Sequence, residues 1–353
     1  MRSTREVVLV ICAVAGVRSA SGSLCVPTGC GGKVYISDVQ GIILYHKAHE
    51  ELILRVDYDV RGATGPITKL AWIIPTPRKP EFTGTASADV FGELSEFTAA
   101  KYAGEATVPA VRGGELPEQL VLAEPNVHPL KGSGKGGIAA VNEWLQQRGL
   151  QAIPPETTRY YAEFRWSFTA VLFEMPQGVP ARGRLRPVRL SFTADRVHFP
   201  LLLCAQQGVF DLTLYVVSKG RINRRELGTF GLTLTELETP EMKQSQRLTR
   251  VRDLPEHTRR LFSTIALDVP VLRKLERGRI FLYRTYAHGL NDEDRAISKW
   301  ETDLQLAAPL GSPYSRYKDL AVAVAAVLAV FVVARTRQRA AKAKADAART
   351  LRR

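Results

Sequence analysis

The spacing of apolar and polar residues predicts that the first third of the chain folds into β-strands. Three runs are rich in β-branched and apolar residues, as buried strands are: 39–45, 52–60 and 70–74. The polar residues 47–50 separate the first two runs and indicate a hairpin turn. Pro75 and Pro77 follow the third run, and we expect its strand to end there because proline cannot donate a hydrogen bond to a sheet.

A second block of predicted strands follows a change in composition. Residues 88–100 have apolar side chains at helical spacing and predict an amphipathic helix. Residues 103–137 are rich in glycine, proline and charge, which indicates a loop or a seam between two lobes. Helical spacing returns at 138–148 and stops at Gly149. Four apolar runs then predict a mostly antiparallel sheet: 160–173, 186–192, 198–204 and 211–217.

The pattern beyond residue 234 becomes helical and charged over 240–279, with a strand at 280–286 and a capped helix at 293–300. Taken together, the elements predict an α+β fold that is β-rich, with mostly antiparallel sheets and a few packed helices. No internal repeat or long heptad pattern interrupts this order.

The longest uncharged run lies near the C-terminal end and predicts one transmembrane helix. Residues 320–334 form a run of 15 residues without charge, and a basic tail at 335–353 follows. A helix of that length rises about 22 Å, less than the ~30 Å hydrocarbon core, although flanking tyrosine and basic side chains can reach the headgroups. A soluble core helix is the alternative, but the run offers no polar face to water.

The residues of this predicted anchor have two roles. Some face lipid along the helix: Leu320, Val324, Leu328, Phe331 and Ala334. Others set the topology, because basic residues tend to stay in the cytoplasm: Arg335, Arg337 and Arg339. We therefore expect a single-pass membrane protein whose N-terminal domain lies outside the cytoplasm and whose tail lies inside.

The N-terminal segment agrees with this topology. A basic start, an apolar stretch of 11 residues at 7–17 and small residues at 19–22 are typical of a secretory signal peptide. An uncleaved anchor is the alternative, but the stretch is too short to span a bilayer. The chain is thus predicted to divide into five parts: 1–20 signal peptide, 21–130 N-terminal β-rich lobe, 131–308 C-terminal α+β lobe, 309–334 juxtamembrane segment and transmembrane helix, and 335–353 cytoplasmic tail.

The total net charge suggests a nucleic-acid partner, but the distribution of that charge along the chain argues against one. The chain carries +14 at a pI of about 9.8. Residues 1–20 account for +2 and residues 335–353 for +7, so the roughly 300 residues between them carry only +5. Three arginine clusters remain in that middle part: 182–189, 221–225 and 247–252. They can meet anionic lipid or polymer, but solvated strand edges and loops are the favoured interpretation.

Cysteine usage fits an oxidising compartment. Cys25 and Cys30 can close a small disulfide ring, which would stabilise the fold by ~2 kcal/mol at most. Cys204 has the sequence context of a buried strand residue, and with three thiols in the mature chain the pairing stays open. The chain has no Cys-x-x-Cys motif, which argues against a zinc or thioredoxin-like site.

The sequence predicts no cofactor and no metal site. His46 and His49 lack the further histidine, at Ile53, that a zinc-protease motif requires, and an exposed turn is the favoured interpretation. The acidic run at 291–294 fails the EF-hand pattern, and the glycine-rich 132–137 fails the Walker pattern. No nucleophile motif is present either, so enzymatic activity is not predicted.

Several short motifs resemble one known family. They are Cys30-Gly-Gly32, Ala71-Trp-Ile-Ile-Pro-Thr-Pro77, Asp89-Val-Phe-Gly-Glu-Leu94, Val141-Asn-Glu-Trp-Leu145, Arg186-Pro-Val-Arg-Leu-Ser-Phe192, His198-Phe-Pro-Leu-Leu-Leu203 and Asp211-Leu-Thr-Leu-Tyr-Val-Val217. In this order they resemble the bacterial secreted proteins of domain of unknown function twenty-three thirty, over about residues 25–307. The resemblance implies a signal peptide and often a C-terminal span, and it implies no activity or cofactor.

The sequence therefore predicts a membrane-anchored extracytoplasmic domain that serves as a binding or structural module of the cell envelope. Its expected partners are membrane lipid, through the C-terminal helix, and an envelope protein or polymer, but not nucleic acid. The alternative is an envelope hydrolase whose catalytic groups meet only in the fold. Two titrating groups in contact in a deep pocket would favour the hydrolase, whereas an aromatic or basic surface would favour the binding module.

Overall fold

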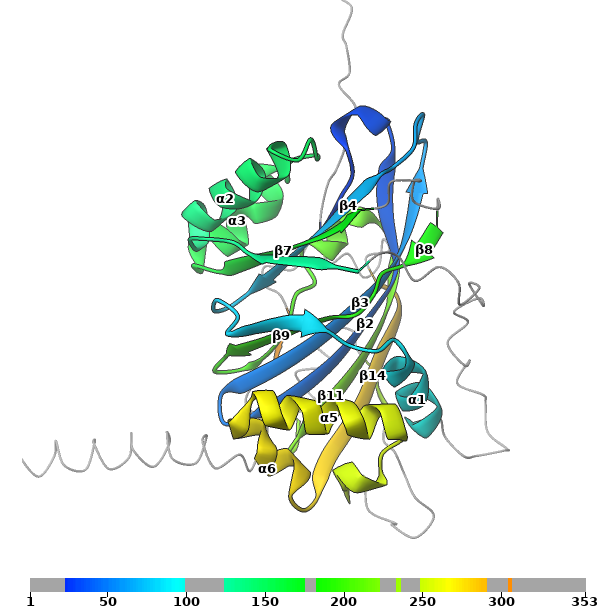
Figure 1. Cartoon of the computed structure of the whole chain (residues 1–353), viewed down its shortest axis with the longest axis vertical. Coiled ribbons are helices and arrows are strands. Elements are labelled where there is room, and N and C mark those ends of the chain that lie inside the picture. Colours follow the sequence, from blue (N-terminus) through cyan, green and yellow to red (C-terminus); the bar gives the residue numbers. More distant parts are fainter. Residues whose placement is uncertain are drawn as a thin grey trace, which may run out of the picture.

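A large twisted sheet dominates the computed structural model (Figure 1). The structure describes residues 23–98, 124–174, 182–222, 233–235, 248–290 and 304–306. The strand order is β12-β14-β11-β2-β3-β9-β5, with β8 beside β3 and β13 beside β14. The strands are β2 (Lys33–His46), β3 (His49–Arg61), β5 (Phe82–Thr85), β8 (Arg182–Arg184), β9 (Val188–Thr193), β11 (Phe210–Ser218), β12 (Thr233–Thr235), β13 (Leu248–Thr249) and β14 (Ile280–Leu290).

Pairing in this sheet is antiparallel at every described neighbour except one. β2 and β11 run parallel, with Ile42 beside Tyr215. The prediction of a β-rich fold with mostly antiparallel sheets is confirmed for the described residues. Strands from both predicted lobes alternate in the sheet, so the predicted boundary near residue 130 does not separate one sheet from another.

A smaller sheet packs against one face of the large one. Its order is β1-β4-β7-β6, with β1 (Leu24–Cys25), β4 (Lys69–Thr76), β6 (Asn126–Pro129) and β7 (Ser167–Glu174). A two-stranded pair lies nearby, formed by β10 (Val197–Phe199) and β15 (Leu304–Leu306). The ring of Phe199 in β10 lies close against β2, where a Cβ on Gly41 would come within 2.3 Å of it. Only glycine fits at that position.

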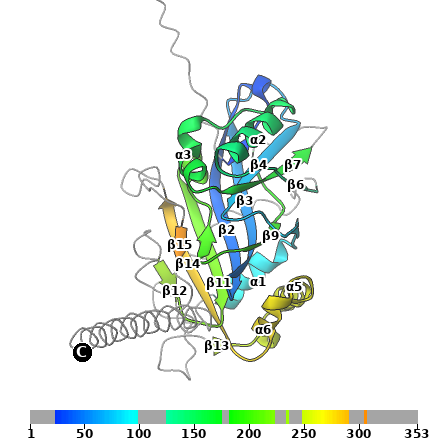
Figure 2. The same cartoon turned by 90° about the vertical axis from the view of Figure 1, so that its left-hand side faces the viewer.

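The helices form two groups at opposite ends of the long strands (Figures 1 and 2). α2 (Gly134–Gln146) and α3 (Pro155–Glu163) pack together beside β7, whereas α1 (Asp89–Thr98), α5 (Glu256–Asp268) and α6 (Arg273–Glu276) lie over the large sheet. Short 3-10 helices complete the described elements: η1 (Thr28–Cys30), η3 (Cys204–Gln207), η4 (Val251–Asp253) and η5 (Pro270–Leu272). No helix in these described ranges is long and apolar enough to cross a membrane.

Both faces of the large sheet are buried, which explains the nearly continuous apolar runs in its sequence. Successive residues of a strand point to opposite faces. Ile42 and Leu44 of β2 face the group of α1 and α5, whereas Ile43 and Tyr45 face the smaller sheet. Each of these four side chains is at most 1% exposed.

The first described residues are also part of the core. Ser23 to Val26 are at most 2% exposed, and the side-chain amide of Gln207 forms two hydrogen bonds with the backbone of Leu24. Its Oε1 accepts from Leu24 N at 2.8 Å, and its Nε2 donates to Leu24 O at 2.8 Å. Gln207 thereby supplies β1 with the partners that another strand would provide.

Four of the predicted elements are wrong in type or extent. The predicted strand 198–204 is one of them, because β10 ends at Phe199 and Cys204 begins η3. β4 continues through Pro75 to Thr76, because β1 pairs only with Ala71 and Trp72 and no second strand needs the missing N–H at Pro75. The start of the predicted strand 160–173 is the end of α3, which begins with Pro155 at its first position, where proline fits a helix. Gly134–Gly137 form the first turn of α2 and not a loop.

The predicted membrane anchor, with Leu320, Val324, Leu328, Phe331 and Ala334, lies outside the described residues. The same is true of the three topology arginines at 335, 337 and 339 and of the helix predicted at 293–300. The anchor and its orientation therefore stay predictions. The predicted signal peptide, residues 1–20, also lies outside the described ranges.

Candidate functional site

A pocket of about 630 Å³ opens where several turns meet beside the smaller sheet. Two turns supply most of it, the β2–β3 hairpin turn and the β9–β10 turn, and the α3–β7 link closes one side. The lining residues are Lys47, Ala48, Pro77, Arg78, Phe164, Arg165, Trp166, Thr193, Ala194, Asp195, Arg196, His198 and Gln305. The volume lies in the range usual for small-molecule sites.

Four cations surround this pocket against one carboxylate, that of Asp195. They are Lys47, Arg78, Arg165 and Arg196, and all four are exposed. Within the described ranges none of the four forms an ion pair, whereas other arginines of the fold do. We call them the rim cations. Among the described lining residues four positive charges stand against one negative charge, so the pocket attracts anions.

The backbone around the pocket is strained at three positions. Lys47, Ala48 and Arg165 have φ angles of 52°, 57° and 55°, and within the described ranges they are all the non-glycine residues with positive φ. Side chains other than glycine and asparagine adopt this conformation at a cost of roughly 1–2 kcal/mol. Such strain concentrates at functional sites, and here every case lines one pocket.

Each strained position has an evident local cause. Lys47 and Ala48 are the two central residues of the hairpin turn between His46 and His49, a turn that requires positive φ at both places. Arg165 follows the end of α3, where the N–H of Trp166 donates to the carbonyl of Tyr161 at 3.3 Å and a glycine usually stands. The sequence thus places two cations where the backbone alone would prefer glycine or asparagine.

Aromatic side chains form one wall of the pocket. Phe164 is 60% exposed, and Trp166 is only 3% exposed behind it. Tyr160 packs between them, with ring centroids 4.9 Å from Phe164 and 5.6 Å from Trp166. Gln305 donates from Nε2 to the hydroxyl of Tyr160 at 2.8 Å. The wall therefore presents an apolar ring, that of Phe164, to the pocket, and the packed side chain of Tyr160 supports that ring.

His198 lies at the floor of the pocket as a neutral imidazole. It is 1% exposed, and its ring packs edge-on against Trp166 with centroids 4.3 Å apart. Burial lowers the pKa of His198 to about 3, an effect that the nearby carbonyl of Pro75 opposes only in part. Both ring nitrogens are buried atoms, so neither is open to the pocket. A general base must come within hydrogen-bond reach of the proton that it takes up, and His198 is not placed to do so.

Glu50 holds the strand that carries His198. Its Oε2 accepts from the backbone N–H of His198 at 2.8 Å, and the side chain is fully buried. Burial raises the pKa of Glu50 well above its ordinary value, although this hydrogen bond acts in the opposite direction. Oε1 has no partner among the described residues. Glu50 therefore positions the floor of the pocket without reaching the pocket itself.

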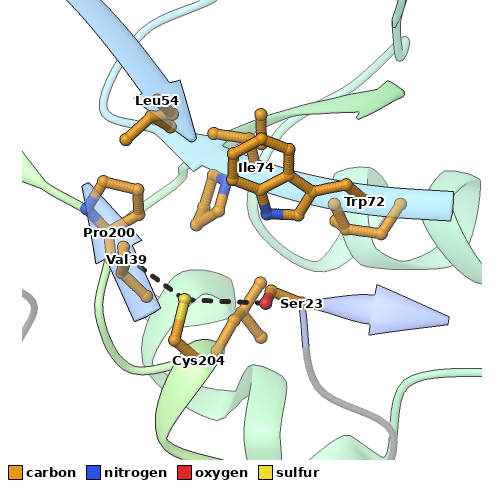
Figure 3. Close-up of a pocket in the computed structure, with 10 residues that line it drawn as sticks. Ser23, Val39, Leu54, Trp72, Ile74, Pro200 and Cys204 are labelled. Carbon is orange, nitrogen blue, oxygen red and sulfur yellow. Dashed lines mark hydrogen bonds between the residues drawn. The ribbon is translucent and has the colours of Figure 1, made fainter. Parts of the chain in front are cut away.

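A second cavity is too small to bind a ligand. It has a volume of about 10 Å³, and its walls include Ser23, Trp72 and Cys204 (Figure 3). The hydroxyl of Ser23 and the thiol of Cys204 lie 3.5 Å apart across it, and the thiol also donates to the carbonyl of Pro200 at 3.9 Å (Figure 3). A single water molecule barely fits such a space. This cavity belongs to the packing of β1 against η3.

The two cysteines that the sequence allows to form a disulfide are thiols in this structure. Cys25 and Cys30 are both buried thiols, and burial raises the pKa of Cys25 to about 12, so its thiolate does not form near neutral pH. The two cysteines are held by different neighbours: Cys25 pairs with Ala71 in the smaller sheet, and the carbonyl of Cys30 accepts from Thr64. Cys204 is buried as predicted, but it lies in η3 and not in a strand.

Other sequence candidates are absorbed by structural contacts. His46 and His49 flank the turn but are only 4% and 7% exposed, so the interpretation as an exposed pair is wrong. Each of the four arginines in the cluster 182–189 meets a carboxylate, although the side chains of Arg182 and Arg186 remain 69% and 40% exposed, as expected for a solvated strand edge. The pairs are Arg182–Asp59, Arg184–Asp57, Arg186–Glu124 and Arg189 with Glu51 and Asp268. The charges of these arginines are thus paired with carboxylates of the chain itself.

Sequence reasoning missed most of the pocket. Phe164, Arg165 and Trp166 lie in the middle of the predicted strand 160–173, and Asp195 lies between the predicted strands 186–192 and 198–204. The local signal was present, because a cation between two aromatic residues after a proline-started segment is unusual for a buried strand. The assembly of four separate segments into one rim has no signal in a single sequence.

Comparisons with known proteins add a family but no activity. A family model described as an uncharacterised protein conserved in bacteria (DUF2330) matches residues 49–236. No curated protein matches the chain. Among solved structures, baculovirus P35 is similar with a TM-score of 0.36, 8% identity and coverage of 61% of this chain and 74% of that chain. A mutated baculovirus P35 after caspase cleavage is similar with a TM-score of 0.29, 8% identity and coverage of 60% of this chain and 77% of that chain. TM-scores this low do not establish a shared fold.

Proposed function

Because this chain belongs to the bacterial family DUF2330, whose description assigns no activity, we propose its function from the pocket itself. We propose a membrane-anchored, extracytoplasmic binding module whose pocket holds an anionic ligand of the cell envelope. The observation that carries the proposal is the rim of four cations, none of which is paired with a carboxylate among the described residues. The strained backbone at two of the cations supports it.

Binding is favoured over hydrolysis by the state of His198. A hydrolase would need a histidine poised to take up a proton near neutral pH and a group that orients it. His198 has a pKa lowered to about 3 by burial, and both of its ring nitrogens are buried away from the pocket. The rim cations are suited to holding an anion in place.

The proposal that this domain lies outside the cytoplasm rests on the sequence alone. The signal-like residues 1–20 and the uncharged run 320–334 before a basic tail support an anchored protein with this domain outside. An anionic polymer or an acidic protein of the envelope would then lie within reach of the pocket.

The test is a binding measurement on the full chain in detergent micelles, with dextran sulfate as a soluble polyanion. Replacing Lys47, Arg165 and Arg196 by glutamine removes three rim charges. We expect at least a tenfold weaker affinity at ~0.1 M salt, because exposed charges still act over the Debye length of ~10 Å. The basic tail is identical in both proteins, so the difference reports the pocket.

A matched variant controls for overall charge. Arg259, Lys274 and Arg277 are exposed residues of the α5–α6 end, and replacing them by glutamine removes the same three charges. Affinity within twofold of the unchanged protein is expected for this control. Equal losses in the two variants would overturn the proposal, because binding would then follow net charge alone.

A further inference from the structure

The pocket lies where the domain is joined to its proposed anchor. Gln305 of β15 lines the pocket, and β15 is held there by its pairing with β10. Residues 307–319 separate this strand from the start of the uncharged run at Leu320. A segment of that length reaches about 50 Å at most, even when fully extended. If residues 320–334 span a membrane, as proposed, the link to that span begins at the wall of the pocket.

The charges around the pocket suit the surface of such a membrane. Anionic lipids present phosphate groups, and each lysine or arginine near their surface strengthens attachment about fivefold. Three of the four rim cations are arginines, whose planar guanidinium groups can bind one phosphate through two hydrogen bonds. All four rim cations are exposed, so they can meet a flat surface as well as a soluble molecule.

An exposed aromatic ring accompanies these cations. Three large apolar side chains are exposed in the described ranges, those of Phe164, Val209 and Leu267, and only the first is aromatic. Phe164 ends α3 and directly precedes Arg165. Apolar rings next to basic side chains are typical of membrane surfaces, where the ring enters the headgroup layer and the cation contacts phosphates. The pairing of Phe164 with Arg165 therefore favours a lipid surface over a fully hydrated anion.

We propose that the face of the domain around this pocket docks on the anionic surface of the membrane that holds the anchor. Lipid phosphates lie among the rim cations, and the ring of Phe164 lies between the headgroups. This inference rests on the proposed function, because it names the anion that the same pocket binds. The anchor keeps the lipid surface within reach at all times, so that even a weak contact is occupied. A soluble anion has no such advantage.

Protection of a cysteine at the pocket from chemical labelling tests the docking. Thr193 lines the pocket and is exposed, so Thr193→Cys places a thiol there and keeps the rim cations and Phe164. The full chain is placed in nanodiscs of phosphatidylcholine, with or without about one third phosphatidylglycerol, and treated with an uncharged polyethylene-glycol maleimide. We expect labelling to be at least fivefold slower in the anionic discs at ~0.1 M salt. This protection should disappear at ~1 M salt, which screens charges beyond about 3 Å.

Gly65→Cys is the matched control. Gly65 is exposed, and a Cβ there meets no atom within 4 Å. It follows the end of β3 that is opposite to the hairpin turn, and the 13 residues of β3 span roughly 40 Å. Its labelling rate should agree within twofold in the two kinds of disc, and the chain without an added cysteine gives the background. Equal rates for Thr193→Cys in the two kinds of disc, or equal protection of both positions, would overturn the proposal.

Variants of the face test its two contacts on the Thr193→Cys background. The three glutamine replacements among the rim cations should abolish the protection. Phe164→Ala should reduce it about two- to fivefold, and Phe164→Trp should restore it, because tryptophan is favoured at membrane interfaces. Val209→Ala is the control, since Val209 is also exposed, at 53%, but precedes β11. Unaltered protection in Phe164→Ala would contradict the place of its ring between the headgroups.

The two proposals fail in different ways. Rim-dependent binding of dextran sulfate without protection in anionic discs would overturn the docking alone. The same holds if inorganic phosphate, added at constant ionic strength, abolishes the protection, because the pocket would then prefer a soluble anion. If neither dextran sulfate nor the anionic discs respond to the rim replacements, the binding function is overturned as well.

Discussion

At the scale of single residues, the pocket shows a conflict between stability and side-chain placement. Lys47 occupies a turn position for which asparagine or glycine is better suited, and Arg165 occupies the same kind of position after α3. Both side chains belong to the rim cations. At these positions the backbone conformation favours glycine or asparagine, whereas the proposed binding function favours a cation. Such conflicts are common at binding sites.

Replacing Lys47 by asparagine should separate the two effects. Asparagine tolerates a positive φ, so we expect the free energy of unfolding to rise by roughly 0.5–1 kcal/mol, while affinity for dextran sulfate falls. Lys47→Gln removes the same charge without relieving the backbone, and it should weaken binding with no gain in stability. Urea denaturation and calorimetry measure both quantities. A gain in stability for both variants would show that the charge, not the backbone, causes the strain.

Glu50 gives a residue-scale prediction about pH. Because burial raises the pKa of this carboxyl, the folded state favours its protonated form. That stabilisation is complete below the ordinary pKa of 4.5 and is lost as the pH rises through the raised value. Glu50→Gln stays neutral and keeps an acceptor for His198, so it should be more stable than the original chain at pH 8 by about 1 kcal/mol or more.

At pH 4 the same substitution should make little difference, because Glu50 is then protonated in both the folded and the unfolded chain. Urea denaturation at the two pH values measures the change. Glu96→Gln, at an exposed position of α1, is the control and should alter neither value by more than ~0.5 kcal/mol. A stability difference that is the same at both pH values would rule out a buried acid as its source.

At the scale of elements, one side chain joins two helices. Glu93 of α1 accepts four hydrogen bonds at the start of α5. Its donors are the backbone N–H groups of His257 and Thr258, the ring of His257 and the hydroxyl of Thr258. Partial burial alone would raise the pKa of Glu93, but these bonds lower it to about 2. The first turn of α5 thus obtains its cap from another helix.

Glu93→Ala should therefore lower the free energy of unfolding by about 2 kcal/mol at pH 7, as expected for the loss of a charged helix cap. Since the folded pKa is depressed, this contribution is present above about pH 4.5 and disappears as the pH falls toward 2. Urea denaturation between pH 3 and pH 7 measures it. Glu96→Ala on the exposed side of α1 is the control, and a loss of equal size there would contradict the capping role.

The helices and strands also show how much of the fold can be predicted from a single sequence. Strands with clear β-branched runs, such as β11 and β14, were predicted at nearly their observed positions. Errors arose at two prolines. The strand predicted to end at Pro75 continues through it as part of β4, and Pro155 begins α3, a helix that the sequence did not predict. The spacing of apolar residues indicates which positions are buried. Whether a strand can continue through a proline depends on whether a neighbouring strand needs the missing N–H, and a single sequence does not show that.

At the scale of the whole molecule, the pocket depends on segments that are distant in the sequence. The β2–β3 turn, the α3–β7 link and the β9–β10 turn come together only because β9 pairs with β3 and β7 pairs with β4. No local motif records this assembly, so the sequence predicted the class of fold but not this pocket. The membrane anchor, in contrast, is a local pattern and was predicted from composition alone.

Fusions to a reporter that is active only outside the cytoplasm test the proposed orientation. A reporter placed after Leu306 should be active, and one placed after Arg353 should be inactive, because the basic tail is expected to stay inside. Immunoblots of both fusions control for expression. The opposite pattern of activity would refute the topology and, with it, the access of the pocket to envelope ligands.

The pairing of Leu24 with Gln207 has a consequence for the order of events in folding. On the proposed topology, with a signal peptide at 1–20, the chain crosses the membrane from its N-terminal end and presents Ser23 to Val26 outside long before Gln207 arrives. Until then, the backbone of Leu24 lacks both of its side-chain partners, and a buried site for this segment does not exist. The earliest residues to emerge are thus expected to be among the last to settle, and during that interval they stay accessible to the protease that removes a signal peptide.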